Sequence, residues 1–151
     1  MSEKNYESLM PGHGICFPLY AVSKEIIRLY RPYLEEMNLT YTQYFVMMVM
    51  WEKKKISVKE IGKFLYLDSG TLTPVLKSLE SKGYVTRYRS SEDERILLVE
   101  ITDEGLRLRE NASTIISDVR SKVNISNEEG AKIYHQLYFL LDKLKDKKLN
   151  L

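Results

Sequence analysis

At 151 residues and 44% apolar, the chain has the size of one domain and enough apolar side chains for a core. Its formal charge of +2 is nearly neutral, which indicates neither a polyanion-coating protein nor one that adheres to membranes. No apolar run approaches the roughly 18–20 residues of a membrane span, and no export signal is visible, so we expect a cytoplasmic protein. The single cysteine, Cys16, excludes an internal disulfide, and two distant histidines add no metal-ligand spacing; no cofactor is expected.

The first predicted helix covers residues 17–37, after a start that contains Pro11, Gly12 and Gly14. Its apolar residues lie on more than one face, whereas a helix that packs on one side needs a single stripe. The extra apolar coverage predicts that this helix also packs against a second copy of the chain.

The second predicted helix runs from Tyr41 to about Lys53 and opens with a capping box formed by Thr40 and Gln43. Its centre, FVMMVMW, is apolar all round, which predicts burial on all sides. Methionine fills irregular gaps well, so its three methionines are interpreted as core residues rather than as a soft-metal site.

A helix-turn-helix follows. Ser57 and Glu60 form a capping box for a short helix, and Asp68 is the N-cap of the next one. Val75, Leu76 and Leu79 are its predicted buried side. Gly83 is its expected C-terminal stop.

Two predicted strands, 84–89 and 96–101, form a hairpin behind that helix, and a charged loop joins them. A helix fits the major groove, where its N-terminal residues meet base edges, and guanidinium groups of a hairpin can reach phosphate or a narrow minor groove. The alternative is an ordinary solvated surface. The candidate DNA-binding residues are Ser69, Thr71, Thr73, Lys77, Arg87, Asp93 and Arg95.

Net charge does not favour nucleic acid in this region. Between Asp68 and Arg95 five cationic residues balance five anionic ones. The prediction of DNA binding therefore rests on where the charges lie and not on their sum. An ion pair between Asp93 and Arg95 would hold the tip of the hairpin in shape, with the acid steering the guanidinium.

Two further helices are predicted after the hairpin. Thr102 caps one helix that includes Leu106 and continues through Val119, and Ser126 with Glu129 opens a last, long amphipathic helix. Together with residues 17–37 these helices are candidates for a dimer interface.

The run LDSGTLTPVLKSLESKGYVTRYRSSEDER, followed by ITDEG, resembles the winged helix of the MarR family of bacterial transcription regulators. The segments CFPLYAVSKEI and LTYTQYFVMMVMWE extend the likeness to a narrower branch, the organic hydroperoxide resistance regulators. The resemblance covers most of residues 15–105. It implies a mainly α fold with a β-hairpin wing, in one unit of residues 1–151. Dimerisation helices would lie in 1–37 and 103–151, and the DNA-binding winged helix-turn-helix in 40–102.

Cys16 allows two interpretations from the residues alone. It is either an inert, buried small hydrophobe or a reactive thiol. Pro18 suits the first turn of a helix and would place Cys16 at the positive end of the helix dipole, which favours thiolate, while Tyr20 lies one turn away. The resemblance favours the second interpretation, because Cys16, Tyr20, Tyr30 and Tyr41 match the family's sensing cysteine and its hydroxyl partners.

The spacing of these residues requires a dimer. Cys16 and Tyr30 are 14 residues apart, about 21 Å along one helix, so only a two-fold axis could bring Tyr30 and Tyr41 of one subunit to Cys16 of the other. A second cysteine is absent, so the chain resembles the one-cysteine type. Oxidation would then give a sulfenic acid that a small thiol can cap as a mixed disulfide.

The prediction is a homodimeric, peroxide-sensing repressor that binds a pseudo-palindromic duplex and is not an enzyme. The alternative is a relative whose effector is a small phenolic or aromatic ligand, held between the dimer helices and the DNA-reading region.

Overall fold

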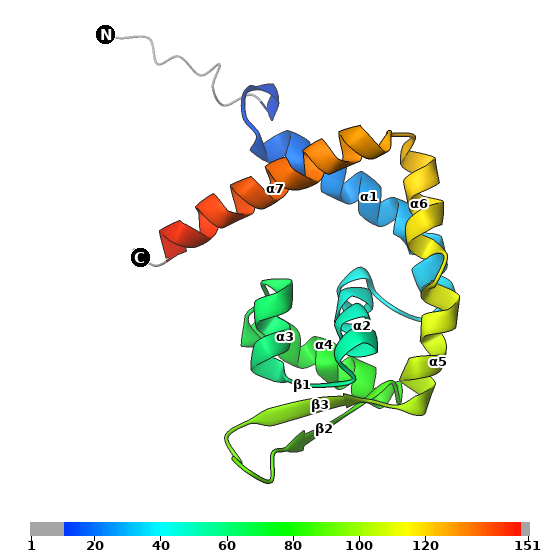
Figure 1. The fold of residues 1–151 in the computed structure, drawn as a ribbon, viewed down its shortest axis with the longest axis vertical. Coiled ribbons are helices and arrows are strands. Elements are labelled where there is room, and N and C mark those ends of the chain that lie inside the picture. Colours follow the sequence, from blue (N-terminus) through cyan, green and yellow to red (C-terminus); the bar gives the residue numbers. More distant parts are fainter. Residues whose placement is uncertain (1–10, 149–151) are drawn as a thin grey trace. The chain divides into compact units, whose positions relative to one another are not determined.

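The computed structural model describes residues 11–148, which form two compact units (Figure 1). The first unit extends to Ile115, and the second begins at Ile116. The helices of the first unit, preceded by the 3-10 turn Pro11–His13, are α1 (Cys16–Glu36), α2 (Tyr41–Lys53), α3 (Val58–Leu65), α4 (Ser69–Ser81) and α5 (Asp103–Ala112). A small sheet accompanies them, so the mainly α fold class with a hairpin wing is confirmed. None of the described helices is both long and apolar enough to cross a membrane.

Helix α2 is the central element of the first unit and lies against α1, α3, α4 and α5. The predicted capping box is present, because Thr40 Oγ1 accepts from Gln43 N and Gln43 Oε1 accepts from Thr40 N. Met47 and Met50 are fully buried, which confirms two of the three methionines as core residues, whereas Met48 is half-buried. Trp51 is also buried and donates its indole N–H to Gly105 O at 2.8 Å, which joins α2 to α5.

Burial of α2 on all sides is wrong. Phe45 is 36% exposed and Tyr41 is only half-buried, although Tyr30 of α1 packs against the Tyr41 ring. The sequence of α2 does not distinguish an apolar face that is buried in the core from one that is exposed to solvent.

The helix-turn-helix consists of α3 and α4, and its caps are those predicted. Ser57 forms a complete capping box with Glu60, and Asp68 accepts from Thr71 N at 2.8 Å. The turn between the helices closes through Tyr66, whose left-handed backbone (φ 56°) reverses the chain. The buried side of α4 differs from the prediction in one position, since Val75 is only half-buried. Its fully buried residues are Leu72, Leu76 and Leu79.

The sheet has three antiparallel strands in the order β1-β3-β2, with bounds β1 Lys55–Ser57, β2 Val85–Arg89 and β3 Leu97–Ile101. The predicted hairpin is confirmed, each strand starting one residue later, and it projects from the rest of the unit (Figure 1). Strand β1 was not predicted, because three residues are too few to show a two-residue period. It pairs Ile56 with Val99 and so ties the start of the helix-turn-helix to the wing.

The base of the wing is fixed by two glycines and a threonine. Gly83 follows the end of α4 with φ 75°, a left-handed conformation that glycine adopts without strain. Thr102 donates its hydroxyl to Gly83 O at 2.6 Å and caps α5 by accepting from Gly105 N at 3.0 Å. At Gly105 the backbone of Tyr84 approaches so closely that a Cβ would lie 2.2 Å from Tyr84 O.

We expect Gly105→Ala to destabilise the protein by about 3 kcal/mol, because a methyl group at this contact forces α5 away from the wing. The same shift would strain the bond from Trp51 Nε1 to Gly105 O. Chemical denaturation measures the free energy of unfolding. Gly14→Ala is the control, since nothing lies within 4 Å of its added Cβ. Equal stability of both variants would contradict the close approach.

The single helix predicted from Thr102 through Val119 is in fact two helices, α5 and α6 (Ile115–Val123). Ser113 interrupts it, because its amide and its hydroxyl both bond to Glu110 O, at 3.2 Å and 2.7 Å. Serine hydroxyls compete in this way with the regular helix ladder. The second unit contains most of α6, and α7 (Asn127–Lys148), whose predicted capping box between Ser126 and Glu129 is present.

Candidate DNA-binding surface and cysteine site

The first two turns of α4 present the predicted hydroxyl-rich surface. Ser69, Thr71, Thr73 and Lys77 are all exposed, whereas Leu72, Leu76 and Leu79 of the same helix are buried. Asp68 organises the start of the helix, because its carboxylate accepts from the backbone and then the side chain of Thr71, and both bonds lower the pKa of Asp68. Thr73 Oγ1 donates to Ser69 O at 2.6 Å, so its hydroxyl oxygen can still accept a hydrogen bond, and the side chain is exposed. The surface thus offers short donors, acceptors and methyl groups, which suit base edges and phosphates.

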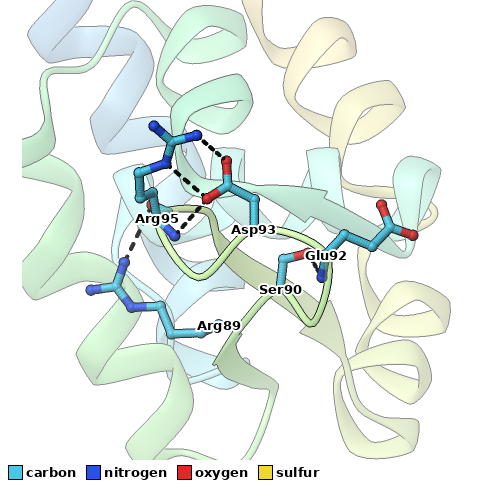
Figure 2. A network of polar contacts seen from close by, with 5 residues as sticks. All are labelled: Arg89, Ser90, Glu92, Asp93 and Arg95. Carbon is cyan, nitrogen blue, oxygen red and sulfur yellow. Dashed lines mark hydrogen bonds and ion pairs between the residues drawn. The ribbon is translucent and has the colours of Figure 1, made fainter.

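The tip of the wing is held by the predicted pair of Asp93 and Arg95. Arg95 donates Nε to Asp93 Oδ1 and Nη2 to Asp93 Oδ2, each at 2.9 Å, and its backbone N–H donates to Oδ1 at 3.0 Å (Figure 2). These bonds lower the pKa of the Asp93 carboxyl. Arg89 supports the same loop by donating Nη1 to Arg95 O at 3.3 Å. The Arg95 side chain is nevertheless 90% exposed, so the pair orients a guanidinium that remains open to a ligand.

Arg87 lies in a different environment from Arg95. Its guanidinium donates Nε and Nη2 to Glu80 Oε2, at 3.0 Å and 2.6 Å, and its backbone N–H donates to Glu80 Oε1. The hydrogen bonds from Arg87 lower the pKa of Glu80. Only 17% of the Arg87 side chain is exposed, so it fastens β2 to α4, and its role in contacting DNA stays a prediction.

Cys16 is exposed and is the first residue of α1, which gives it the helix-terminal position that the proline pattern indicated. Ile15, at the N-cap, contributes no side-chain hydrogen bond to the first turn of the helix. Tyr20 is exposed one turn later, and Lys24 Nζ lies 5.3 Å from the centroid of its ring.

The structure brings Tyr30 and Tyr41 of the same chain together, across the junction of α1 and α2. Their ring centroids are 5.2 Å apart in an edge-to-face arrangement. Tyr44 lies 5.9 Å from Tyr30, and Phe45 lies 4.7 Å from Tyr41. Sequence reasoning missed Tyr44 and Phe45, although their spacing of three and four residues from Tyr41 places all three on one side of a helix.

The aromatic cluster of Tyr30, Tyr41, Tyr44 and Phe45 keeps its phenols protonated. Burial, with smaller contributions from the neighbouring Tyr30 and Tyr44, raises the pKa of Tyr41 to about 12. Burial likewise raises the pKa of Tyr30 and of Tyr44. These phenols are therefore protonated at neutral pH and can donate hydrogen bonds there.

We expect a spectrophotometric titration to show a tyrosine that ionises near pH 12, and Tyr41→Phe to remove it. Because the folded pKa lies above the ordinary value of about 10, the unfolded chain releases this proton first, and folding stability declines between about pH 10 and 12. Tyr20→Phe is the control. A wild-type titration in which all tyrosines ionise near pH 10 would contradict the burial of Tyr41.

The helix-turn-helix, its exposed hydroxyl-rich helix and the arginine-tipped wing define the class of winged-helix DNA-binding regulators. The family model for the transcriptional regulators SarA/Rot matches residues 28–111. The organic hydroperoxide resistance transcriptional regulator of Bacillus subtilis is 40% identical over 145 residues, covering 96% of this chain and 99% of that protein. SarZ of Staphylococcus haemolyticus is 42% identical over 126 residues, covering 83% of this chain and 86% of SarZ.

Solved structures agree with these relatives. Reduced AbfR bound to DNA superposes with a TM-score of 0.74 at 32% identity, covering 91% of this chain and 96% of AbfR, a protein of Staphylococcus epidermidis. AbfR with a disulfide formed gives a TM-score of 0.63, over 93% of this chain and 95% of that one. The chain belongs to the MarR family of transcription regulators, in the branch of the organic hydroperoxide resistance regulators. It is a DNA-binding regulator and not an enzyme.

Proposed function

We propose that this regulator is a repressor that releases its operator when organic hydroperoxide oxidises Cys16. The observation that carries the proposal is the position of Cys16, the sole cysteine of the sequence, exposed at the first residue of α1. Its relative in B. subtilis is named for organic hydroperoxide resistance, and structures of AbfR are known for the reduced and overoxidised protein bound to DNA and for the protein with a disulfide formed.

The active form would be a homodimer. In the first unit, α1 exposes apolar side chains along its length, and α7 does so in the second; isolated soluble helices rarely leave such surface to water. The exposed residues of α1 and its N-cap are Ile15, Phe17, Leu19, Tyr20, Val22 and Ile27. Those of α7 are Ile133, Tyr134, Leu137, Tyr138, Phe139 and Leu144.

A two-fold axis would complete the redox site. Cys16 begins α1 and Tyr30 lies about 21 Å further along the same helix, so Cys16 cannot reach the aromatic cluster of its own chain. The partner's cluster can be reached if the two α1 helices run antiparallel past each other. Tyr30 and Tyr41, kept protonated by their raised pKa, would then donate hydrogen bonds to the thiolate.

The redox step needs no catalytic residue beyond the thiolate. The Cys16 sulfur attacks the terminal oxygen of the hydroperoxide, the O–O bond breaks, and the alkoxide leaves as an alcohol after taking a proton from water. The product is a sulfenic acid, which a small thiol can convert to a mixed disulfide with loss of water. Both products remove the thiolate that the tyrosines would hold.

Loss of the thiolate would weaken DNA binding by changing the geometry of the dimer. Each α4 would enter a major groove with Ser69, Thr71 and Thr73 toward the bases and Lys77 on phosphate, while Arg95 reaches the backbone or minor groove. Two such helices grip a palindrome only if they lie about 34 Å apart. A sulfur that displaces the tyrosines shifts the dimer helices and alters that spacing, which makes a two-state switch.

The test is a band shift with the promoter region upstream of the regulator's own gene. The reduced protein is expected to bind, protein treated with an alkyl hydroperoxide is expected to release the DNA, and dithiothreitol is expected to restore binding. Binding that is indifferent to oxidant would overturn the redox assignment while leaving DNA recognition intact.

One observation favours a second candidate. The aromatic cluster is partly open, with Phe45 exposed, and could hold a small phenolic ligand as the effector instead. Release of DNA by such a ligand, in protein whose thiol has been kept reduced, would favour this alternative.

A further inference from the structure

A chain of polar contacts joins the start of α2 to the end of α4. Gln43 is 5% exposed, and its Nε2 donates to Ser78 Oγ at 2.9 Å. Lys82 Nζ donates to Gln43 Oε1 at 2.9 Å and to Asn38 O, in the α1–α2 junction, at 2.6 Å. The same Gln43 Oε1 accepts from Thr40 N at 3.0 Å. We call Gln43, Ser78 and Lys82 the Gln43 link.

The Gln43 link exceeds what a helix cap requires. The capping box is complete with Thr40 and Gln43 alone, as it is at Ser126 and Glu129, where both partners are exposed. At α2 the capping side chain is buried as well and bonded to a helix 35 residues away in sequence. Burial of a glutamine and part of a lysine costs free energy unless each polar atom finds a partner. The Gln43 amide finds partners in Ser78 of α4 and in Lys82, the C-cap of α4.

The position of the link connects the two sites described above. Gln43 lies two residues after Tyr41 in the first turn of α2, and Tyr41 packs edge-to-face on Tyr30. At the other end, Ser78 lies in the last turn of α4 and Lys82 is the C-cap of that helix, whose first turn carries the exposed Ser69 and Thr71.

We propose that the Gln43 link transmits the state of the aromatic cluster to α4, so that Gln43, Ser78 and Lys82 are positioning residues of the switch. The inference rests on the proposed function, since it needs oxidation of Cys16 to displace Tyr41. The first turn of α2 moves with Tyr41 and carries the Gln43 amide with it. Ser78 and Lys82 follow, because their hydrogen bonds to that amide are short and directional.

Helix α4 converts the movement into a change at the DNA. It has 13 residues and is therefore about 20 Å long. Held at its C-terminal end by the link and along one side by buried leucines, it responds to a shift of that end by tilting as a rigid rod. A tilt displaces the hydroxyl-rich N-terminal turns relative to the groove.

The experiment compares Ser78→Ala and Lys82→Met with Ser81→Ala in the full-length protein. Ser81 lies on the same helix but donates only to Ser78 O within α4, so it is a matched control. Operator affinity is measured for reduced and for hydroperoxide-treated protein, and the ratio of the two dissociation constants is the readout. Ser78→Ala changes no charge, which separates the link from any contact between Lys82 and phosphate.

We expect the ratio to fall at least threefold in Ser78→Ala and in Lys82→Met, with reduced-state affinity within about threefold of wild type and Ser81→Ala unchanged. A ratio equal to wild type in both link variants overturns the inference while the redox switch stands. Loss of reduced-state binding together with a lower melting temperature also overturns it, because the link would then be only structural. If wild-type protein is not released by oxidant, the proposed function fails, and there is no signal for the link to carry.

Discussion

Cys16→Ser is expected to bind the operator as tightly as reduced wild type and to keep it in the presence of hydroperoxide. Serine preserves the size and hydrogen-bonding capacity of the side chain, but its hydroxyl cannot form a sulfenic acid or a mixed disulfide. For wild type we expect oxidation to raise the dissociation constant at least about tenfold, within the range typical of coupled sites. For the variant we expect a ratio near one.

The measurement is a fluorescence-anisotropy titration of labelled operator with each protein, before and after alkyl hydroperoxide. A sulfenic acid and a methionine sulfoxide both add one oxygen atom, so intact mass is read before and after dithiothreitol and compared with Cys16→Ser; Cys16 is the only cysteine among the oxidisable residues, which include six methionines. Wild type should gain one oxygen atom, or one small thiol when that thiol is present. Hydroperoxide release that persists undiminished in Cys16→Ser would remove the thiol from the mechanism and favour the ligand-responsive alternative.

The double variant Ile133→Glu, Leu137→Glu is expected to be monomeric and to bind the operator at least about a hundredfold more weakly. Both side chains are exposed on α7, so the substitutions should cost the single chain little folding energy. Across a two-fold axis they would place like charges opposite one another in the proposed interface. A monomer binds only one half-site of the operator. It therefore loses the gain in affinity that comes from holding a second α4 next to the second half-site.

Size-exclusion chromatography with light scattering gives the mass, and the same anisotropy titration gives the affinity. Lys132→Glu is the control, because Lys132 forms an exposed ion pair with Glu128 on the polar side of α7. A double variant that stays dimeric would move the proposed interface away from this stripe. A monomer that binds as tightly as wild type would instead show that one wing and one α4 suffice for DNA binding.

Sequence alone determined the features that depend on local chemistry. The capping boxes at Thr40, Ser57 and Ser126, the cap at Asp68 and the stop at Gly83 were all predictable, because each requires only side chains a few residues from the backbone groups they satisfy. The bounds of α2 followed directly. The ion pair of Asp93 and Arg95 was predictable for the same reason, since its partners are two residues apart.

Tertiary structure alone decided which distant residues meet. Tyr30 packs on Tyr41, Arg87 binds Glu80, β1 pairs with β3, and Gln43 bonds to Ser78. No local sequence pattern predicts any of these contacts. The exposure of Phe45 was likewise undetermined, because an apolar helix face is equally compatible with a core and with a surface left for a partner. Hydrophobic period and capping chemistry act over one or two turns of helix, whereas these contacts depend on how complete elements pack against one another.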